Sequence, residues 1–443
     1  MRRLAVLASV LGGCFSPQPP ANAPCSLAGT CPSGLSCVAN ACVAPGTLAI
    51  DAPLVGIDAT DAPLAIDAPA APTFTPSNGV DPTLVDNLSA TIDIDAPTTI
   101  DVDTGAITGA ITRDGGTGVH AGIAYTKLPS GIAVFGFANL TVTSTGQVGF
   151  TGSRPVVFLV GGTAMISGKI DGTGGTCNGD PACAGPGGGR GAIATGTAGG
   201  CAAGRGGVTN PADNSDSGGG GGGGGGQGAA GGAGGDMYPG GVGGASCLPG
   251  TLEPLAGGSG GGGGGAGATK ASHGGGGGGA LQITARGLLK ITGTIAMGGG
   301  GGEQGFLDPG ATTNGSAGGG GGAGGAILLE APMLTLTPGS VLAANGGGGG
   351  GGGFASSNDG FPGAPGGTST MPAQGGAFGA MGSGAGGNGG AGMTGPTPGQ
   401  NGNAGSNGGG GGGGVGRIFL RATTTPMPAG LQSPPAGTAK LKP

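Results

Sequence analysis

The sequence predicts an all-β protein, and more narrowly a right-handed parallel β-helix (solenoid) with long glycine-rich insertions. Two observations lead to this fold class. Short apolar blocks with the two-residue alternation of strands recur along residues 98–425. Most of the 124 glycines in the 443 residues lie between these blocks. Each block is too small to bury its own apolar face, so it must stack on a similar neighbour, and such stacking builds a solenoid.

Four of the blocks align when they are set side by side, starting at Pro155, Gly279, Gly325 and Gly416. The first three keep one order of elements: strand, small turn, strand, glycine-containing corner, strand. A further block at 137–152 has no long insertion after it. The aligned apolar residues are Phe158, Ile166 and Ile170 in the first block, Ile283, Ile291 and Ile295 in the second, and Leu328, Leu336 and Val341 in the third.

Within the blocks, the period of two places Leu281, Ile283, Ile327 and Leu329 at inward or stacked positions. Independent short hairpins are the alternative arrangement for these blocks. The order of elements, kept in three successive units, favours the β-helix.

Three glycine-rich insertions separate the blocks, at 171–279, 298–325 and 345–415. Glycine recurs at every third residue in parts of them, most clearly in 386–416. Three residues per turn is the period of the polyproline II helix, and glycine chains in this form can bond side by side because they lack Cβ atoms. Two observations argue against order. Fixing the backbone of each residue costs on the order of 1–2 kcal/mol, and runs such as Gly218–Gly226 show no three-residue period. Ordered polyglycine II bundles and flexible surface loops both remain open, whereas the short, interrupted triplets disfavour a collagen triple helix.

The negative charge of the chain is confined to one segment. Eleven of the 21 acidic residues lie between Asp51 and Asp114, where Arg113 is the only basic residue. Asp-Ala-Pro recurs within residues 44–97, and proline together with like charges keeps a chain extended. We therefore expect a disordered N-terminal stalk, an Asp/Ala/Pro-rich linker, over 44–97. With few aromatic residues and a pI near 4.7, the chain has no footprint for binding nucleic acid.

In residues 1–13, two arginines precede an apolar stretch that is too short to span a bilayer as a helix. This segment resembles a bacterial lipoprotein signal peptide. Leu11-Gly12-Gly13-Cys14 would be the lipobox, with Cys14 the lipidated first residue of the mature protein. The resemblance implies a membrane partner through the acyl chains at Cys14, an exported protein and an outer-membrane location. Ordinary secretory cleavage nearby is the alternative.

The eight other cysteines fall into two sets of four, and even sets are expected for disulfides in an oxidising compartment. The first set lies in a small Cys-rich segment, 14–43, and lacks the paired spacing of zinc sites. The second lies in the first glycine-rich insertion, where crosslinks favour a defined shape. The connectivity cannot be deduced. The disulfide candidates are Cys25, Cys31, Cys37, Cys42, Cys177, Cys183, Cys201 and Cys247.

No catalytic, cofactor-binding or metal-binding residue is predicted. The G-x-S-x-G match at 257–261 lies in a glycine tract without the strand, turn and helix that a nucleophile elbow needs. His120 and His273 are too few for a His-rich metal site, and the Asp-rich linker matches no calcium loop. We expect the charged residues on or beside the blocks to be solvated rather than stacked into a catalytic ladder. These residues are Arg154, Lys169, Asp171, Arg286, Lys290, Glu330, Arg417 and Arg421.

The lipobox, the Cys-rich segment, the Asp-Ala-Pro stalk and the glycine-separated blocks together resemble the glycine-rich exported lipoproteins of predatory and soil deltaproteobacteria, such as the myxobacteria. This resemblance implies a surface or envelope location and supplies no catalytic residues. The glycine triplets are also similar in period to those of glycine-rich adhesin tips and of a glycine-rich antifreeze protein.

The expected function is that of a lipid-anchored, cell-surface structural or adhesive protein without catalytic activity, with a surface glycan or envelope component as its candidate partner. A binding module for a repetitive surface, either glycan or ice, is the first alternative. A β-helix carbohydrate-active enzyme is the second. Residues 426–443 are expected to form a C-terminal tail.

Overall fold

The chain divides into two units, Met1–Ala68 and Pro69–Pro443. The expected signal peptide, Cys14, Cys25 and linker residues 44–73 lie outside the described residues. The computed structural model describes residues 26, 30, 31, 33, 35–38, 41–43 and 74–443, apart from 179, 181–182, 193–195, 197, 210–215, 233–237, 268–269, 308–314, 355–357, 381, 404 and 427–428.

In the first unit, β1 (Ser36–Val38) and β2 (Ala41–Val43) pair in an antiparallel hairpin. A disulfide joins Cys31 to Cys42, and Cys37 is also disulfide-bonded. The Cys-rich segment therefore contains a crosslinked hairpin.

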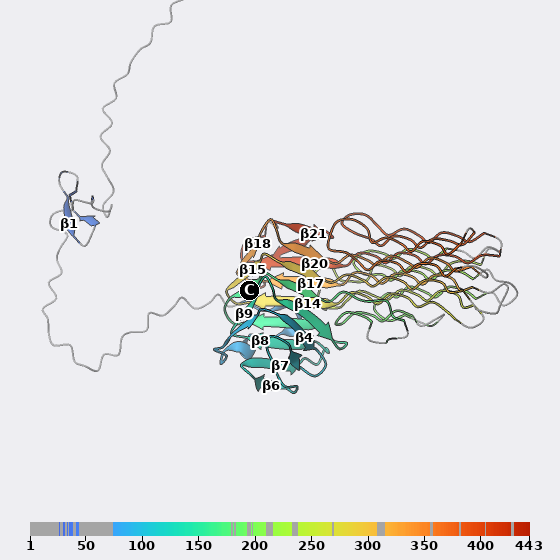
Figure 1. Ribbon diagram of the computed structural model, residues 1–443. Helices are drawn as coiled ribbons and strands as arrows, with labels where there is room; N and C mark the ends of the chain where they lie inside the picture. The colour runs from blue at the N-terminus through green and yellow to red at the C-terminus, as the bar shows by residue number, and fades with distance from the viewer. Residues whose placement is uncertain are drawn as a thin grey trace, which may run out of the picture. The chain divides into compact units, whose positions relative to one another are not determined.

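The second unit is all-β and rich in parallel pairs (Figure 1). Its described residues contain no α-helix, only the short 3-10 turns η1 (Ser77–Gly79) and η2 (Pro82–Val85). Its strands form sheets of seven, eight and five strands. The seven-stranded sheet contains, in spatial order, β21 (Leu431–Ser433), β19 (Val341–Ala343), β16 (Thr294–Ala296), β13 (Lys169–Asp171), β10 (Gln147–Thr151), β4 (Pro97–Asp101) and β5 (Ile107–Thr108).

The eight-stranded sheet contains β22 (Gly437–Lys440), β20 (Arg417–Ala422), β17 (Ala326–Glu330), β14 (Ala280–Ala285), β11 (Val156–Val160), β8 (Ala133–Phe137), β7 (Ile123–Lys127) and β6 (Gly118–His120). The five-stranded sheet contains β18 (Met333–Leu336), β15 (Leu288–Ile291), β12 (Ala164–Ile166), β9 (Asn139–Val142) and β3 (Thr91–Ile94).

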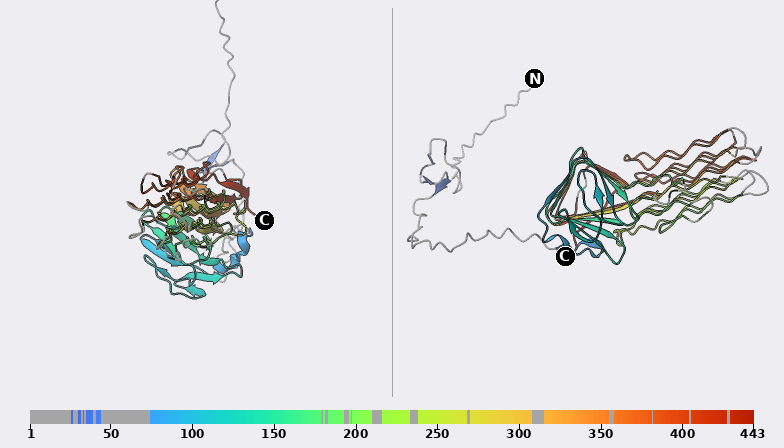
Figure 2. Two further views of the ribbon diagram at one scale, coloured as in Figure 1. Left: turned by 90° about the vertical axis from the view of Figure 1, so that its right-hand side faces the viewer. Right: turned by 60° about the horizontal axis from the view of Figure 1, so that its bottom comes forward.

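From β8 to β19, successive strands enter the eight-, five- and seven-stranded sheets in that order, and each new strand pairs in parallel with the strand of the previous pass. The inner faces of all three sheets share one apolar core (Figure 2, right). One column of this core runs through Phe135, Phe158, Ile283, Leu329 and Leu420 by direct strand pairing. Burial of each such side chain stabilises the fold by roughly 1.5–3 kcal/mol.

The inward positions expected at Leu281, Ile283, Ile327 and Leu329 are confirmed. The alignment of Leu328 with Ile283 is wrong, because Ile283 pairs with Leu329. A slip of one residue turns a side chain to the opposite face.

The alignment of Val341 with Ile295 is wrong for the same reason, because Ile295 pairs with Leu342. Both errors arise at corners. Thr284 pairs with Glu330 but Leu288 with Met333, so the corner after β17 is one residue shorter than the corner after β14.

The middle of the eight-stranded sheet is buried on both faces. Strands β8, β11, β14 and β17 are buried along their whole lengths, whereas β9 and β15 alternate. Leu328 lies in a second apolar cluster on the outer face, together with Val157, Leu159 and Leu252. Continuous apolar strands are the signature of a sheet covered on both sides.

Residues 74–88, which we call the strap, cross this outer face. Thr75 N donates to Lys442 O at 3.3 Å, just beyond β22. Asn78 Nδ2 donates to Gln282 Oε1 on β14 at 2.9 Å. At the other end of the strap, η2 packs against β8 and β11. The strap therefore ties strands from the last pass to strands from the first.

Two expected boundaries differ from the positions of the strands. Strands β3 and β4 begin at Thr91 and Pro97, inside the segment 44–97 that the sequence suggested as a linker. Strands β21 and β22 extend the sheets into 426–443, which was expected to be a tail.

Candidate binding surface

All three glycine-rich segments leave the sheets at the same corner. Residues 172–279 connect β13 to β14, residues 297–325 connect β16 to β17, and residues 344–416 connect β19 to β20. Each connection runs from the seven-stranded to the eight-stranded sheet, and stacked strands lie about 4.8 Å apart. The segments are thereby brought side by side (Figures 1 and 2), and we call them together the glycine bundle.

The interior of the bundle is seen best around residues 316–325. All ten backbone N–H groups of this segment donate to backbone carbonyls of other parts of the chain. Successive residues turn to different partners: Gly320 donates to Gly262, Gly321 to Gly411 and Gly322 to Gly300, and the same partner segment returns every third residue. The segment donates to 259–265, 297–306 and 408–414, and accepts from 219–222, 275–278 and 347–353.

Six neighbouring segments therefore surround residues 316–325. Such an arrangement satisfies buried backbone polar groups without any sheet. The glycine-rich residues that the structure describes here are hydrogen-bonded elements of the fold, which argues against flexible surface loops for this part of the chain.

Glycine is required here for space and not for conformation. A Cβ added at Gly319, Gly321 or Gly322 would lie 2.0–2.1 Å from a backbone carbonyl oxygen of a neighbouring segment. None of these three glycines has a positive φ. The backbones approach so closely that no side chain fits between them.

The number of glycines per triplet follows the position in the bundle. Gly318–Gly322, in the interior, is glycine throughout and fully buried. Segment 384–390 has two glycines in three, and its Ala385 and Asn388 are half-buried. Segment 360–366 has one glycine in three; these glycines are buried, and the residues between them are exposed or half-buried. In a threefold helix each position in the triplet points in its own direction, so only a direction that faces solvent accepts a side chain.

The triplet pattern of 386–416 suggested one continuous extended segment, but the structure interrupts it at two turns. Gly392 and Gly405 have positive φ values of 56° and 69° and lie in turns. The aperiodic run Gly218–Gly226, by contrast, belongs largely to the interior, where Gly219 and Gly222 donate to Gly318 and Gly321.

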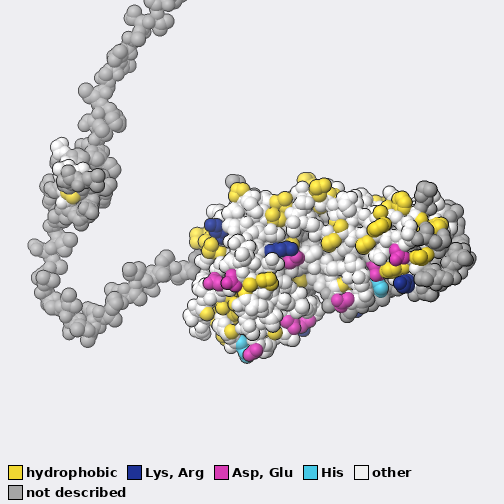
Figure 3. All heavy atoms as spheres, in the orientation of Figure 1, with side chains coloured by type: hydrophobic (Ala, Val, Ile, Leu, Met, Phe, Trp, Pro, Cys, Tyr) yellow, Lys and Arg dark blue, Asp and Glu magenta, His cyan; other side chains and the backbone are white. Residues whose placement is uncertain are grey.

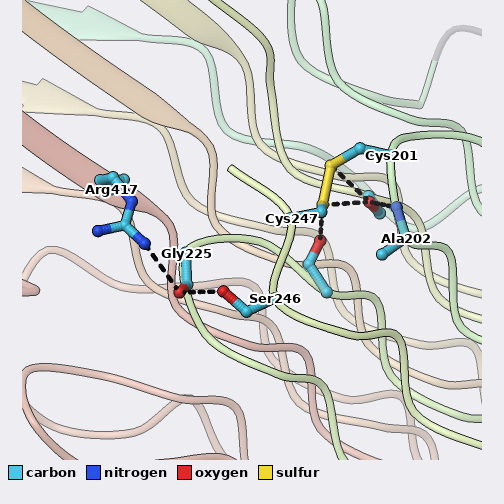
Figure 4. Close-up of a disulfide and its surroundings, with 8 residues drawn as sticks. Cys201, Ala202, Gly225, Ser246, Cys247 and Arg417 are labelled. Carbon is cyan, nitrogen blue, oxygen red and sulfur yellow. Dashed lines mark hydrogen bonds between the residues drawn. A yellow bond between two sulfur atoms is a disulfide. The ribbon is translucent and has the colours of Figure 1, made fainter. Parts of the chain in front are cut away.

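Two disulfides crosslink the first glycine-rich segment, Cys177–Cys183 and Cys201–Cys247. Figure 4 shows the second, which lies near Ser246, Gly225 and Arg417. Gly225 O accepts hydrogen bonds from Ser246 Oγ at 2.7 Å and from Arg417 Nη2 on β20 at 3.3 Å. Because Cys201–Cys247 closes a loop of 46 residues, the chain-entropy model assigns it about 4 kcal/mol of stabilisation.

The third glycine-rich segment carries large apolar side chains at its surface but almost no charge. In residues 344–416 the only charged residue is Asp359. Phe361 N donates to Ala377 O at 2.9 Å, so Phe361 and Phe378 lie on neighbouring segments. Figure 3 shows apolar patches spread over the bundle. Six of the nine exposed large apolar side chains in the described part of the chain belong to it: Val208, Val242, Phe361, Met371, Phe378 and Met393.

The serine of the G-x-S-x-G match and the two histidines form no metal-binding group in the described part of the chain. Ser259, at the centre of the G-x-S-x-G match, is fully buried in the bundle, and its Oγ accepts from Ala202 N at 2.9 Å. His273 Nδ1 contacts the carboxylate of Glu303, which also accepts from His273 N at 2.9 Å. His120 is exposed on β6.

The expectation of solvated charges is wrong for Glu330 and Arg421, which are only 1% and 3% exposed. Glu330 accepts hydrogen bonds from Ser77 N at 3.1 Å and Ser77 Oγ at 2.6 Å, and from Gln282 Nε2 and Thr284 Oγ1 at 3.0 Å each. Arg421 Nε lies 3.8 Å from the same carboxylate. This cluster could not be predicted from the sequence, because the strap that covers it is far away in the chain.

Other charges on or beside the strands form pairs at the surface. Lys169 contacts Asp171 at 2.6 Å. Burial alone would raise the pKa of Asp171, but hydrogen bonds from Lys169 and Thr173 outweigh it, so this pKa lies below its usual value. Arg154 lies 3.2 Å from Asp103, and Arg286 pairs with Asp86 of the strap.

Within the part of the chain that the structure describes, no group of three or more His, Cys, Asp or Glu side chains is placed to hold a metal ion. No helix among these residues is long and apolar enough to cross a membrane. No protein-family model, curated protein or solved structure matches this chain.

Proposed function

We propose that this protein is a lipid-anchored cell-surface protein, without catalytic activity, in which a parallel β-helix presents a polyglycine II bundle for adhesion. The observation that carries the proposal is the bundle around residues 316–325, a segment with six hydrogen-bonded neighbours. A rigid support of this kind can hold exposed apolar side chains in fixed positions, and fixed anchors lower the entropic cost of binding.

The outer side chains support an adhesive role. Exposed apolar patches mark interaction sites, and adaptable Met and aromatic residues are frequent in them. Phe361 and Met371 are 58% and 69% exposed on a surface that is almost free of charge. The state of Glu330, a charged residue on strand β17, supports the absence of catalysis, since its carboxylate already accepts four hydrogen bonds.

The location can be tested by proteolytic shaving of intact cells that express the tagged full chain. We expect the bundle to be cleaved from whole cells, and a Cys14→Ser variant to leave the cell envelope. Protection of the bundle until the outer membrane is opened would contradict a surface location.

Adhesion can be tested on the same cells with a Phe361→Ser/Phe378→Ser variant. We expect it to lower attachment to surfaces, because two exposed apolar anchors are removed while the buried backbone bonds remain. Val119→Ser on β6 is the control, since Val119 is at least as exposed as the two Phe residues but lies outside the bundle. Unchanged attachment of the Phe variant would contradict the adhesive role.

A binding module for a repetitive surface, glycan or ice, is the second candidate. It is favoured by the three-residue step of the outward positions, which repeats at about 9.3 Å in a polyproline II-type helix. Binding that survives the loss of Phe361 and Phe378 but fails when the triplets of 360–366 are scrambled would favour this candidate.

A further inference from the structure

A pocket of about 640 Å³ lies where the first and third glycine-rich segments meet the end of the strand stack. Its volume is within the range of ligand sites. Its walls come from the turn at 226–229, the turn at 392–396, Val415 and Pro435.

The walls of the pocket are held by hydrogen bonds. Gly226 N donates to Val415 O at 2.9 Å, and Gly392 N donates to Ser433 Oγ at 2.7 Å. Ala391 and Thr394 exchange backbone bonds across the second turn at 3.0 and 2.8 Å. A site built in this way is preformed, so a ligand would not have to order it.

The lining selects for a neutral ligand. None of the residues around the pocket is charged. Pro396 and Val415 form apolar walls, and Met393 adds a largely exposed apolar side chain. Gln227 and Thr394 are exposed, and their side chains make no hydrogen bond with the described part of the chain. An amide and a hydroxyl offer both donors and acceptors, which matches the hydroxyl groups of a sugar ring, and the apolar walls match its C–H face.

We propose that this pocket binds a neutral saccharide unit. The proposal rests on the adhesive function above and names the chemistry of its target, an uncharged surface polysaccharide. An anionic saccharide would lose hydration without gaining a partner of opposite charge, so it is excluded.

The test uses the full chain with Cys14→Ser, purified, and neutral oligosaccharides of glucose, mannose, galactose and N-acetylglucosamine, with a uronic acid oligosaccharide as the charged probe. Calorimetry is expected to show binding of at least one neutral probe and none of the charged one. Binding of the charged probe alone, or of no neutral probe, would overturn the proposal.

A blocking variant locates the site. Gly395 lines the pocket and a Cβ there meets nothing within 4 Å, so Gly395→Leu adds a bulky side chain at the site without a clash with the surrounding atoms. We expect at least a tenfold loss of affinity, and a smaller loss for Thr394→Val. Gly339→Leu is the matched control, because a Cβ there also meets nothing within 4 Å and Gly339, in the turn after β18, does not line the pocket.

Equal affinity of the Gly395 and Gly339 variants would overturn the site. That outcome leaves the proposed function standing if cells still attach through Phe361 and Phe378. Conversely, the protein could bind a saccharide in a way that depends on Gly395 but attach cells to no surface. That result would contradict the adhesive function and support the saccharide site.

Discussion

Ser77 Oγ on the strap donates to Glu330 Oε1 on β17 at 2.6 Å, across 253 residues of sequence. The carboxylate also accepts from Ser77 N and from two side chains of β14, and all of these groups are buried. This contact holds the N-terminal segment of the second unit against the middle of the eight-stranded sheet.

Replacing Glu330 by Ala is expected to destabilise the second unit by about 3–5 kcal/mol, because Ser77, Gln282 and Thr284 would lose a buried acceptor and Arg421 would lose a nearby negative charge. Chemical denaturation measures this change. Asp93→Ala, at an exposed position on β3, is expected to change stability by less than about 0.5 kcal/mol. Similar losses for the two variants would show that the Glu330 contacts contribute little.

A single methyl group in the bundle interior is expected to be costly. Gly321→Ala places a Cβ 2.1 Å from the carbonyl oxygen of Gly347, so the neighbouring segments must move apart at about 1–3 kcal/mol. Hydrogen exchange should then show faster exchange of the amides in 316–325. Gly339→Ala, where a Cβ meets nothing, should leave exchange unchanged, and slow exchange in both variants would contradict the close packing.

Removing Cys201–Cys247 by double substitution with Ser is expected to cost more stability than removing Cys177–Cys183. The loops contain 46 and 6 residues, and the chain-entropy model gives about 4 and about 2 kcal/mol. Limited proteolysis within 202–246 offers a direct measure. Unchanged protease resistance of 202–246 after removal of Cys201–Cys247 would mean that the hydrogen bonds alone fix this segment.

Acid is expected to loosen the contact between Glu253, Arg421 and Lys442. Burial alone would raise the pKa of Glu253, but the hydrogen bond from Lys442 and the charge of Arg421 outweigh it and lower this pKa. A carboxyl group whose pKa is lowered by folding stabilises the folded state at pH values above its pKa in the unfolded chain, about 4.3. This stabilisation is lost as the pH falls through the pKa of the group in the folded protein. The melting temperatures of the wild type and Glu253→Gln should therefore differ at neutral pH and converge in acid. A constant difference would rule out this carboxyl as the titrating group.

The strands could be predicted because their pattern is local. Alternation and the repeated order of elements located β11, β14, β17 and β20, and the inward positions Ile283 and Leu329 followed from them. The register of the third block could not be predicted. It depends on corners whose lengths vary by one or two residues, and nothing in the sequence distinguishes Leu328 from Leu329.

The bundle was predictable only at its surface. A period of three appears in 360–366 because side chains are allowed where the helix faces solvent. In the interior all three directions are covered, so glycine fills every position and the period disappears, as in Gly218–Gly226.

The pocket could not be predicted from the sequence, since its walls are brought together from residues as distant as Gln227 and Pro435. The buried cluster at Glu330 was missed for the same physical reason. Its partner Ser77 is remote in sequence, and a Glu in an apolar strand looks no different from a solvated one.

The contacts of the strap cannot all form at the same time during synthesis of the chain. The strap emerges early, yet the carbonyl groups of Lys442 and Pro443 that Thr75 binds are made 367 and 368 residues later. Until then the outer face of the eight-stranded sheet lacks the contacts between the strap and its last strands. In a chain that stalls before β22, Ser77 and Asn78 can already bind β17 and β14, whereas Thr75 lacks its partners, so only the beginning of the strap stays open for chaperones and proteases to recognise.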